Sequence, residues 1–508
     1  MKTRVMLINS LTMDIGFDNY DHLHHFPLGL LYLASVLRQN NIEVKIVDLN
    51  NLYYIQNFKQ QKEQSKICSI PDYIKSNIAW HFDDFKPDVV GIGCVFTGAF
   101  ECAKVIAEKV KSLFPNIPIV IGGIHATIFS TEILKKHNCI DYVILGEGEV
   151  SFLELVKCLT DENRGSIDSI DGMAFRRDGN IIKNSKTKFM DNLDRLPFID
   201  FSLVEIKNYK LDTSSWYSPK KIKIGLPFPV LSSRSCPCRC TFCSMWLVHG
   251  PKIRFRSYKH VVDELQHHYD QYGARYFSFV DDNLTFNKKR IIKICEEIIK
   301  RGLNIQFDTP NGVAINSLNR ETIVAMVAAG LVKINLSPEN GSEYIRRIAI
   351  GKKLKTEKIY EVFNLCAEHS HLYIGAYFII GMPQETDETL KETYEMITKL
   401  PVDRISFSLA TPYPGTELYE YCKKHGLLQY DHESSYDFKK EYLGSQRPYF
   451  KPHNLNEEDL IKFLEKCRNL MKERRMASDL PENYPLRHTD SKTSDPLSFA
   501  GIINERRD

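Results

Sequence analysis

Three closely spaced cysteines are the residues of this chain best suited to chemistry. Cys236, Cys240 and Cys243 lie in the run Ser-Cys-Pro-Cys-Arg-Cys-Thr-Phe-Cys-Ser, residues 235–244, at C-x3-C-x2-C spacing. A cubane iron–sulfur cluster contains four irons and is commonly held by four cysteine thiolates. Three cysteines would hold three irons and leave the fourth open, and an open metal position lets a substrate coordinate. The spacing therefore predicts a reactive [4Fe-4S] cluster.

Three plainer interpretations of these cysteines stay open. A structural zinc site needs four ligands, usually in two separated pairs, but no second pair follows and His249 is the nearest other candidate. Disulfides would suit a secreted protein, and nothing in the sequence indicates secretion. Ordinary buried cysteines are common. Cys238 could be a fourth ligand, but it would then close the open iron, so we interpret it as a bystander.

The cysteine run, with Phe242 directly before its last cysteine, resembles the motif of the radical S-adenosylmethionine (SAM) superfamily. The resemblance implies that SAM binds the open iron through its amino and carboxylate groups. One electron from the cluster then cleaves SAM to a 5′-deoxyadenosyl radical, which abstracts a hydrogen atom. It also implies a small-molecule substrate and an electron donor such as flavodoxin or ferredoxin.

Apolar runs that alternate with helical segments surround the cysteine motif. Residues 230–233 are the first expected strand of this segment and lead directly into the motif. Further strands are expected at residues 276–280, 304–308, 333–336, 374–380 and 404–409. These strand–helix units predict a partial (β/α)6 barrel, in which the chemistry sits at the carboxyl ends of the strands.

Polar motifs follow three of these expected strands. Asp281 and Asp282 lie where superfamily members hold the SAM amino group, although capping of the next helix explains them equally well. Residues 339–342 resemble the family's Glu-Ser-Gly-Ser motif, and residues 381–386 resemble its Gly-x-Pro-x-Glu-Thr signature near the adenine. The resemblance assigns the following residues to SAM: Phe242, Asp281, Asp282, Glu339, Asn340, Ser342, Gly381 and Pro383.

The first 160 residues also alternate between strands and helices. Strands are expected at residues 3–9, 42–47, 88–93, 117–121 and 142–145, with helices at about 28–37, 98–113 and 149–159. This alternation predicts an α/β fold with a doubly wound, Rossmann-like parallel sheet. Ligands of such sheets bind outside the carboxyl ends of the strands, where glycines let the backbone approach them closely.

The glycine motifs at these strand ends resemble the cobalamin-binding domain that precedes many radical SAM domains. The matching runs are Phe-Pro-Leu-Gly-Leu at 26–30, Gly-Gly-Ile-His-Ala-Thr at 122–127 and Gly-Glu-Gly-Glu at 146–149. The cobalt-ligating Asp-x-His-x-x-Gly of cobalamin mutases is absent, although His22, His24 and His25 lie nearby. The resemblance assigns these residues to cobalamin: Gly29, Gly122, Gly123, His125, Gly146, Glu147 and Gly148.

Composition and length indicate a large globular protein of about three domains. The 508 residues are 43% hydrophobic and 26% charged, with 13 cysteines and a net charge of +3 that argues against nucleic acid as an obligate partner. No apolar run reaches the ~20 residues of a membrane span. No signal peptide is recognisable, so we expect a reducing cytoplasm. The expected parts are a cobalamin-binding domain at 1–160, a linker with a β-hairpin at 161–225, a radical SAM domain at 226–430 and a helical region with a flexible tail at 431–508.

The whole pattern resembles the cobalamin-dependent radical SAM enzymes, a class rich in methyltransferases. It implies hydrogen abstraction by the 5′-deoxyadenosyl radical and methyl transfer from methylcobalamin to an unactivated carbon, or to phosphorus, of a small metabolite. A cyclase or rearrangement enzyme with the same cofactors is the main alternative. A radical SAM methylthiotransferase and a non-enzymatic zinc module rank lower. The sequence alone does not identify the substrate.

Overall fold

The computed structural model describes residues 2–11, 25–55, 70–95, 97–161, 165–209, 225–428 and 450–477. His22, His24 and the predicted flexible tail beyond Ala477 lie outside the described residues. The described residues up to Tyr209, together with Leu247–Gly250, form one compact unit, and those from 225 to Trp246 and from Pro251 onward form a second. The domain boundaries drawn from the sequence stay predictions.

The first unit is built on a seven-stranded sheet with the order β2-β1-β3-β4-β5-β6-β7. β1 to β5 run parallel, as the sequence predicts. An order of 2-1-3-4-5 defines a doubly wound fold, whose ligands bind at the carboxyl edge near the β1–β3 switch point. The strands are β1 (Arg4–Asn9), β2 (Glu43–Asp48), β3 (Val89–Gly93), β4 (Ile119–Gly122), β5 (Tyr142–Ile144), β6 (Met173–Arg177) and β7 (Asn180–Asn184).

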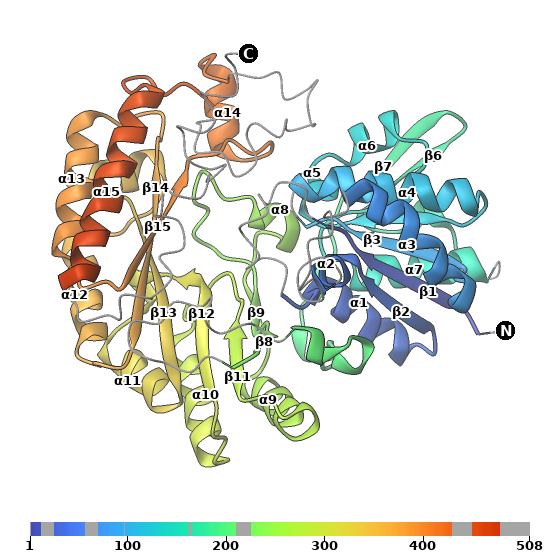
Figure 1. Cartoon of the computed structure of the whole chain (residues 1–508), viewed down its shortest axis with the longest axis horizontal. Coiled ribbons are helices and arrows are strands. Elements are labelled where there is room, and N and C mark those ends of the chain that lie inside the picture. Colours follow the sequence, from blue (N-terminus) through green and yellow to red (C-terminus); the bar gives the residue numbers. More distant parts are fainter. Residues whose placement is uncertain are drawn as a thin grey trace, which may run out of the picture. The chain divides into compact units, whose positions relative to one another are not determined.

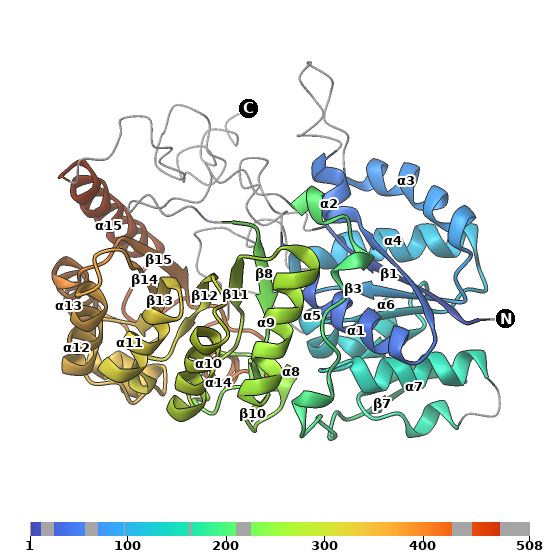
Figure 2. The ribbon, with the colours of Figure 1, turned by 90° about the horizontal axis from the view of Figure 1, so that it is seen from below.

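Helices cover both faces of this sheet, because its central strands are apolar on both sides. Met6 and Ile8 of β1 face a core that includes residues of α3 and α4, whereas Val5 and Leu7 face a core made with α1 and α7. Figure 2 shows α3 and α4 on one side of β1 and β3 and α7 on the other. The helices are α1 (Leu28–Gln39), α2 (Leu49–Tyr54), α3 (Ile70–Phe85), α4 (Phe100–Leu113), α5 (Ile124–Ile128), α6 (Ser130–Lys136) and α7 (Glu149–Thr160).

The β-hairpin expected within residues 161–225 is confirmed: β6 and β7 pair antiparallel around Asp178 and Gly179. Both have positive φ, of 48° and 78°, which a tight two-residue turn requires. The hairpin is more than a linker, because β6 also pairs antiparallel with β5 and extends the sheet. Short 3-10 turns follow at Leu193–Arg195, Phe201–Leu203 and Ile206–Tyr209.

The second unit contains six parallel strands in the order β15-β14-β13-β12-β11-β8. This order, with a helix after nearly every strand, is the predicted partial (β/α)6 barrel. Figure 1 shows the helices α10 to α13 outside the strands. The strands are β8 (Pro227–Val230), β11 (Tyr276–Phe279), β12 (Gln306–Val313), β13 (Leu331–Glu339), β14 (Tyr373–Ile380) and β15 (Arg404–Leu409), with a separate short pair, β9 (Ser233–Arg234) and β10 (Arg254–Phe255).

Aromatic residues on alternate strand positions attach the helices to the barrel. Phe407 of β15 lies against Phe463 of α15 with ring centroids 5.9 Å apart, and against Phe378 of β14 at the same distance. The helices are α8 (Met245–His249), α9 (Tyr258–Tyr272), α10 (Lys288–Lys300), α11 (Arg320–Ala328), α12 (Thr356–Ala367), α13 (Asp387–Lys399), α14 (Glu417–Lys424) and α15 (Glu457–Ala477), with a π-helix at Ile345–Ala349. Within the described residues, no helix has the length and apolar character needed to cross a membrane.

Candidate active site

The three cysteines lie in the loop between β9 and α8, where the chain leaves the carboxyl end of the first barrel strands. Cys236, Cys240 and Cys243 are partly buried, and Cys238 is exposed. The four cysteines of this loop are free thiols in the structure. Cys240 and Phe242 pack on a core formed by residues such as Ile345 and Met382. Packing therefore fixes one side of the loop, while its cysteines stay at least partly exposed.

Three consecutive residues that follow β11 form hydrogen bonds with the segment that leads into this loop. The buried carboxylate of Asp281 accepts hydrogen bonds from the hydroxyls of Ser232 (2.7 Å) and Ser233 (2.5 Å). Asp282 accepts from the backbone N–H of Ser235 at 2.8 Å, which holds that residue at a φ of 72°. The third residue, Asn283, donates its Nδ2 to the sulfur of Cys236 at 3.4 Å.

These contacts decide one alternative left open by the sequence. Neither aspartate caps the next helix, because the N-cap of α10 is Asn287, whose side chain accepts from the backbone N–H of Arg290. Burial raises the pKa of Asp281, whose oxygens are already used by the two serines. Asp281 and Asp282 thus position the cysteine loop, and their predicted contact with the SAM amino group stays a prediction.

Two buried arginines hold the short segment between β8 and β9, which leads toward the cysteine loop. Arg256 donates to the carbonyl of Leu231 at 3.2 Å, and Arg290 donates to that of Ser232 at 2.6 Å. Arg256 is oriented by an ion pair of 2.5 Å with Glu264, and both side chains are almost fully buried. Losing one partner of such a buried pair leaves an uncompensated charge and typically costs about 3–5 kcal/mol. These buried contacts therefore hold the segment that precedes the loop rigidly.

A second segment packs directly against the cysteine loop. Thr241 donates its N–H to Ile350 O at 3.0 Å and its hydroxyl to Ala349 O at 2.6 Å. Lys352 lies just beyond, and its buried ammonium donates to Ser337 O (2.7 Å) and to Glu339 Oε1 (2.9 Å). Burial opposes the charge of Lys352, but the carboxylate of Glu339 and the nearby Cys240 raise its pKa. A cation therefore lies beside the cluster loop.

The two predicted SAM motifs on β13 and β14 are tied to each other. Asn340 is fully buried and donates to Glu385 Oε1 at 2.6 Å, and Glu385 Oε2 accepts the N–H groups of Gly381 (2.5 Å) and Met382 (3.0 Å). Burial raises the pKa of Glu385 to about 7. Ser342 donates its N–H to Asn340 Oδ1 at 2.9 Å. Asn340 therefore acts as a brace between the motifs, and the SAM contacts of Glu339, Ser342, Gly381 and Pro383 stay predictions.

In the first unit, the glycine motifs meet at the carboxyl ends of β4 and β5. Gly123 has a φ of 112°, and a Cβ there would lie 2.2 Å from Cys94 O, so only glycine fits. Thr127 links the motifs, since its hydroxyl donates to Gly123 O (2.8 Å) and accepts from Gly146 N (2.9 Å). A Cβ at Gly29, near the start of α1, would meet nothing within 4 Å, and one at Gly122, at the end of β4, nothing closer than 3.8 Å, so both positions leave open space. Gly148 directly precedes α7.

His125 and Glu147 are placed differently from the glycines. His125 is 1% exposed, lies between Phe100 and Phe129 at ring distances of 4.6 and 4.8 Å, and has a pKa lowered to about 3 by burial. Glu147 is also buried and pairs with Nδ1 of His249 at 3.0 Å. His125 occupies a core position, and the cobalamin contacts assigned to both residues stay predictions.

The donor atoms fit the cofactors that the motifs imply. Three free thiols beside an amide donor and a buried ammonium suit an anionic iron–sulfur cluster, because both neighbours stabilise thiolate charge. No three described His, Cys, Asp or Glu side chains converge tightly enough for a single metal ion. In the first unit, the open space at Gly29 and Gly122 suits a flat macrocycle at the sheet edge.

The structure brings into the site three residues to which the sequence assigns no role: Asn283, Lys352 and Glu385. Asn283 directly follows Asp282, and Glu385 belongs to the Gly-x-Pro-x-Glu-Thr signature, so the motifs could have indicated both. Lys352 depends on tertiary contacts for which the sequence carries no signal. His249, which the sequence offers only as a possible zinc ligand, pairs with Glu147 in the first unit.

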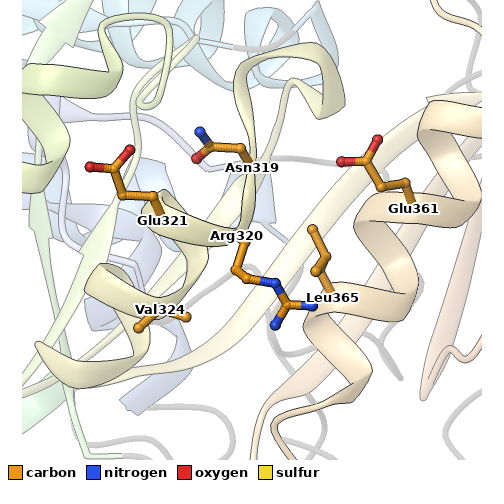
Figure 3. Close-up of a pocket in the computed structure, with 6 residues that line it drawn as sticks. All are labelled: Asn319, Arg320, Glu321, Val324, Glu361 and Leu365. Carbon is orange, nitrogen blue, oxygen red and sulfur yellow. The ribbon is translucent and has the colours of Figure 1, made fainter.

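A depression between α11 and α12, lined by Asn319, Arg320, Glu321, Val324, Glu361 and Leu365, lies on the outer helical layer (Figure 3). Its polar groups already serve the fold. Asn319 caps α11, Arg320 pairs with Glu368 at 2.5 Å, and Glu361 pairs with Lys358 at 2.7 Å. The depression is therefore separate from the cysteine loop and offers no chemistry.

Both units match known protein families. Residues 20–156 match the B12 binding domain family, and residues 230–397 match the Radical SAM superfamily. A protein of Pyrococcus horikoshii named as an uncharacterized methyltransferase is 32% identical over 403 residues, which cover 79% of each chain. Cytidylyl-2-hydroxyethylphosphonate methyltransferase of Streptomyces wedmorensis is 28% identical and also covers 79% of each chain. An anaerobic magnesium-protoporphyrin IX monomethyl ester cyclase of Cereibacter sphaeroides is 28% identical over 78% of this chain and 61% of its own.

Solved structures share the fold. The methyltransferase TsrM of Kitasatospora setae, solved with cobalamin and a [4Fe-4S] cluster, superimposes with a TM-score of 0.65 at 18% identity over 84% of this chain and 78% of its own. The cobalamin-dependent SAM radical enzyme OxsB gives a TM-score of 0.60 at 18% identity over 95% of this chain and 62% of its own. The two family matches and the relative from Pyrococcus, at 32% identity, show that the chain belongs to the cobalamin-dependent radical SAM enzymes.

Proposed function

We propose that this protein is a cobalamin-dependent radical SAM methyltransferase that methylates an unactivated carbon, or phosphorus, of a small molecule. The observation that carries the proposal is the cysteine loop, in which Cys236, Cys240 and Cys243 present free thiols at the carboxyl end of the barrel. Relatives that share both domains include enzymes named as methyltransferases.

Some residues of this chain would bind the cluster, and others position the loop that carries them. The thiolates of the three cysteines hold the [4Fe-4S] cluster, which supplies the electron for SAM cleavage, while cobalamin supplies the methyl carrier. Asp281, Asp282 and Asn283 hold the loop whose cysteines would bind the cluster. We place the chemistry in the cytoplasm, because a cluster that electrons must reach needs reducing surroundings.

Two SAM molecules are needed for each methylation. One would be cleaved, with one electron from the cluster, to methionine and a 5′-deoxyadenosyl group that takes a hydrogen atom from the substrate and is released as 5′-deoxyadenosine. The other would pass its methyl group to cobalamin and be released as S-adenosylhomocysteine, and a second electron from the donor would return the cobalt to the state that accepts this methyl group. We therefore expect 5′-deoxyadenosine, S-adenosylhomocysteine and methylated product in equal yields.

The experiment is turnover with methyl-deuterated SAM on loaded enzyme, with small-molecule fractions as substrate source and mass spectrometry as readout. The proposal expects a product that gains one intact labelled methyl group. A cyclase relative favours one other outcome, in which 5′-deoxyadenosine accumulates with a changed substrate that carries no label. That outcome would reject methyl transfer and favour the cyclase.

A further inference from the structure

An amphipathic turn lies beside the cysteine loop with its apolar side chains turned outward. In and just before the π-helix Ile345–Ala349, Ile345 and Ala349 are buried, whereas Tyr344 and Ile348 are 54% and 51% exposed. Large apolar side chains that are exposed together commonly mark an interaction surface. Because Tyr344 and Ile348 are four residues apart, they lie on the same side of the turn.

This turn is in direct contact with the loop that carries the cysteines. Two hydrogen bonds join Thr241 to Ile350 and Ala349. A Cβ at Gly351 would lie 3.8 Å from Arg239 O, so the two segments touch along their length. On the loop side, Pro237, Cys238 and Arg239 are exposed. A protein seated on the turn would therefore lie beside the cluster ligands.

The surface around the turn is strongly basic. Arg239, Arg347, Lys353 and Lys355 are all exposed, and none of them forms an ion pair within the described part of the chain. Two acids, Glu343 and Glu357, are also exposed in this segment; Glu343 accepts from Thr356 at 3.1 Å, lies 3.7 Å from Arg346 and is close enough to Lys355 to interact with its charge. The whole chain has 67 basic and 64 acidic residues, so this local excess is not a property of the overall composition.

We propose that Arg239, Tyr344, Arg347, Ile348, Lys353 and Lys355 form the docking face for a small acidic one-electron carrier protein. This inference rests on the proposed function, because SAM cleavage requires the cluster to be reduced by one electron in each cycle. The basic side chains steer an acidic partner to this face, and Tyr344 and Ile348 provide the apolar anchor that encounter complexes need. The carrier loses one electron and the cluster gains it, and no atoms are exchanged.

Docking here also suits the direction of electron flow. Electron transfer slows steeply with distance, so a carrier must approach the cluster closely. The exposed residues Pro237, Cys238 and Arg239 give a carrier a close approach to the loop whose cysteines would hold the cluster. Acidic flavodoxins and ferredoxins share the required chemistry, and the two are tested in separate arms.

The test uses a charge-reversed variant, Arg347→Glu/Lys353→Glu, in the full chain loaded with its cluster. Its matched control is Lys293→Glu/Lys300→Glu, which makes the same charge change on exposed positions of α10. Cluster reduction by reduced flavodoxin or ferredoxin is followed by absorbance bleaching, and binding of the oxidised carrier is measured by calorimetry at low and high salt. Dithionite, a small reductant that needs no docking face, reports whether the cluster itself is intact.

The proposal expects the carrier's second-order reduction rate and affinity to fall about tenfold or more in the variant, and the salt dependence to weaken, as for lost steering charges. The control should match the wild type, and dithionite should reduce all three proteins equally. Ile348→Ser should weaken binding without changing the salt dependence. Equal rates with the carrier in variant and wild type would overturn the docking face, whereas a protein that holds no reducible cluster would overturn the proposed function instead.

Discussion

At the residue scale, the site depends on side chains that hold the cysteine loop rather than on the cysteines alone. Asp281, Asp282 and Asn283 contact three successive points of the chain that enters the loop. Their order along the sequence matches the order of their partners, because strand β11 runs parallel to β8 and delivers them beside it. Replacing one of them should therefore change the properties of the cluster, such as its reduction potential, without preventing its binding.

Asn283→Leu tests this at the sulfur of Cys236. An N–H donor to a ligand sulfur stabilises the reduced, more negative cluster, so losing it should make the reduction potential more negative. A tenfold change in the reduction equilibrium corresponds to about 59 mV for one electron. Potentiometric titration followed by electron paramagnetic resonance measures the shift.

Asn283→Asp keeps the shape but loses the donor, so it should shift the potential in the same direction. Asn364→Leu, on the exposed face of α12, is the matched control and should leave the potential unchanged. Unchanged potentials in both Asn283 variants would show that the hydrogen bond is only structural.

At the element scale, the strands and their connections follow from the sequence more directly than the side-chain contacts do. The parallel strands β1 to β5, β8 and β11 to β15 are short apolar runs whose period and spacing identify them. The hairpin at Asp178 and Gly179 was recognisable, but its pairing with β5 depends on a tertiary contact. The burial of His125 and Asn340 could likewise not be predicted without the packed structure. In the sequence alone, a polar residue next to a glycine motif indicates a ligand-binding residue.

The buried His125 gives the first unit a pH dependence. Burial lowers its pKa to about 3 in the folded protein, from an ordinary value of 6.5, so the unfolded chain binds a proton that the folded chain does not. The contribution of the neutral His125 to the free energy of unfolding is therefore fully present above about pH 6.5. It is lost as pH falls toward 3, by up to about 1.4 kcal/mol for each pH unit.

Hydrogen exchange of the β3 and β4 amides, corrected for intrinsic rates, should show protection that falls between pH 6.5 and 4. His125→Gln cannot gain this proton and should show a shallower fall over the same range. His371→Gln, on an exposed histidine of the second unit, is the control and should behave as the wild type. An equally steep fall in His125→Gln would show that other groups cause the pH dependence.

At the scale of the whole molecule, the account assigns one cofactor set to each unit. The first unit offers a glycine-lined sheet edge and the second a braced cysteine loop, and the segment Leu247–Gly250 that follows the loop belongs to the first unit. The pair of Glu147 and His249 fastens this segment to the glycine motif. The two cofactor sites should nevertheless load separately, because no proposed cluster ligand lies in the first unit.

The most direct test of this central claim is metal and corrinoid analysis of the full chain made in cobalamin-fed cells and purified without air. The account predicts about four irons and about one cobalt per chain. Cys236→Ala, Cys240→Ala and Cys243→Ala should lose iron and keep cobalt, and Cys238→Ala should keep both. Gly122→Leu, where a Cβ meets only ordinary contacts, should lose at least about tenfold of the cobalt by filling the sheet edge and should keep its iron. Zinc in place of iron, or wild-type protein without corrinoid, would contradict the account.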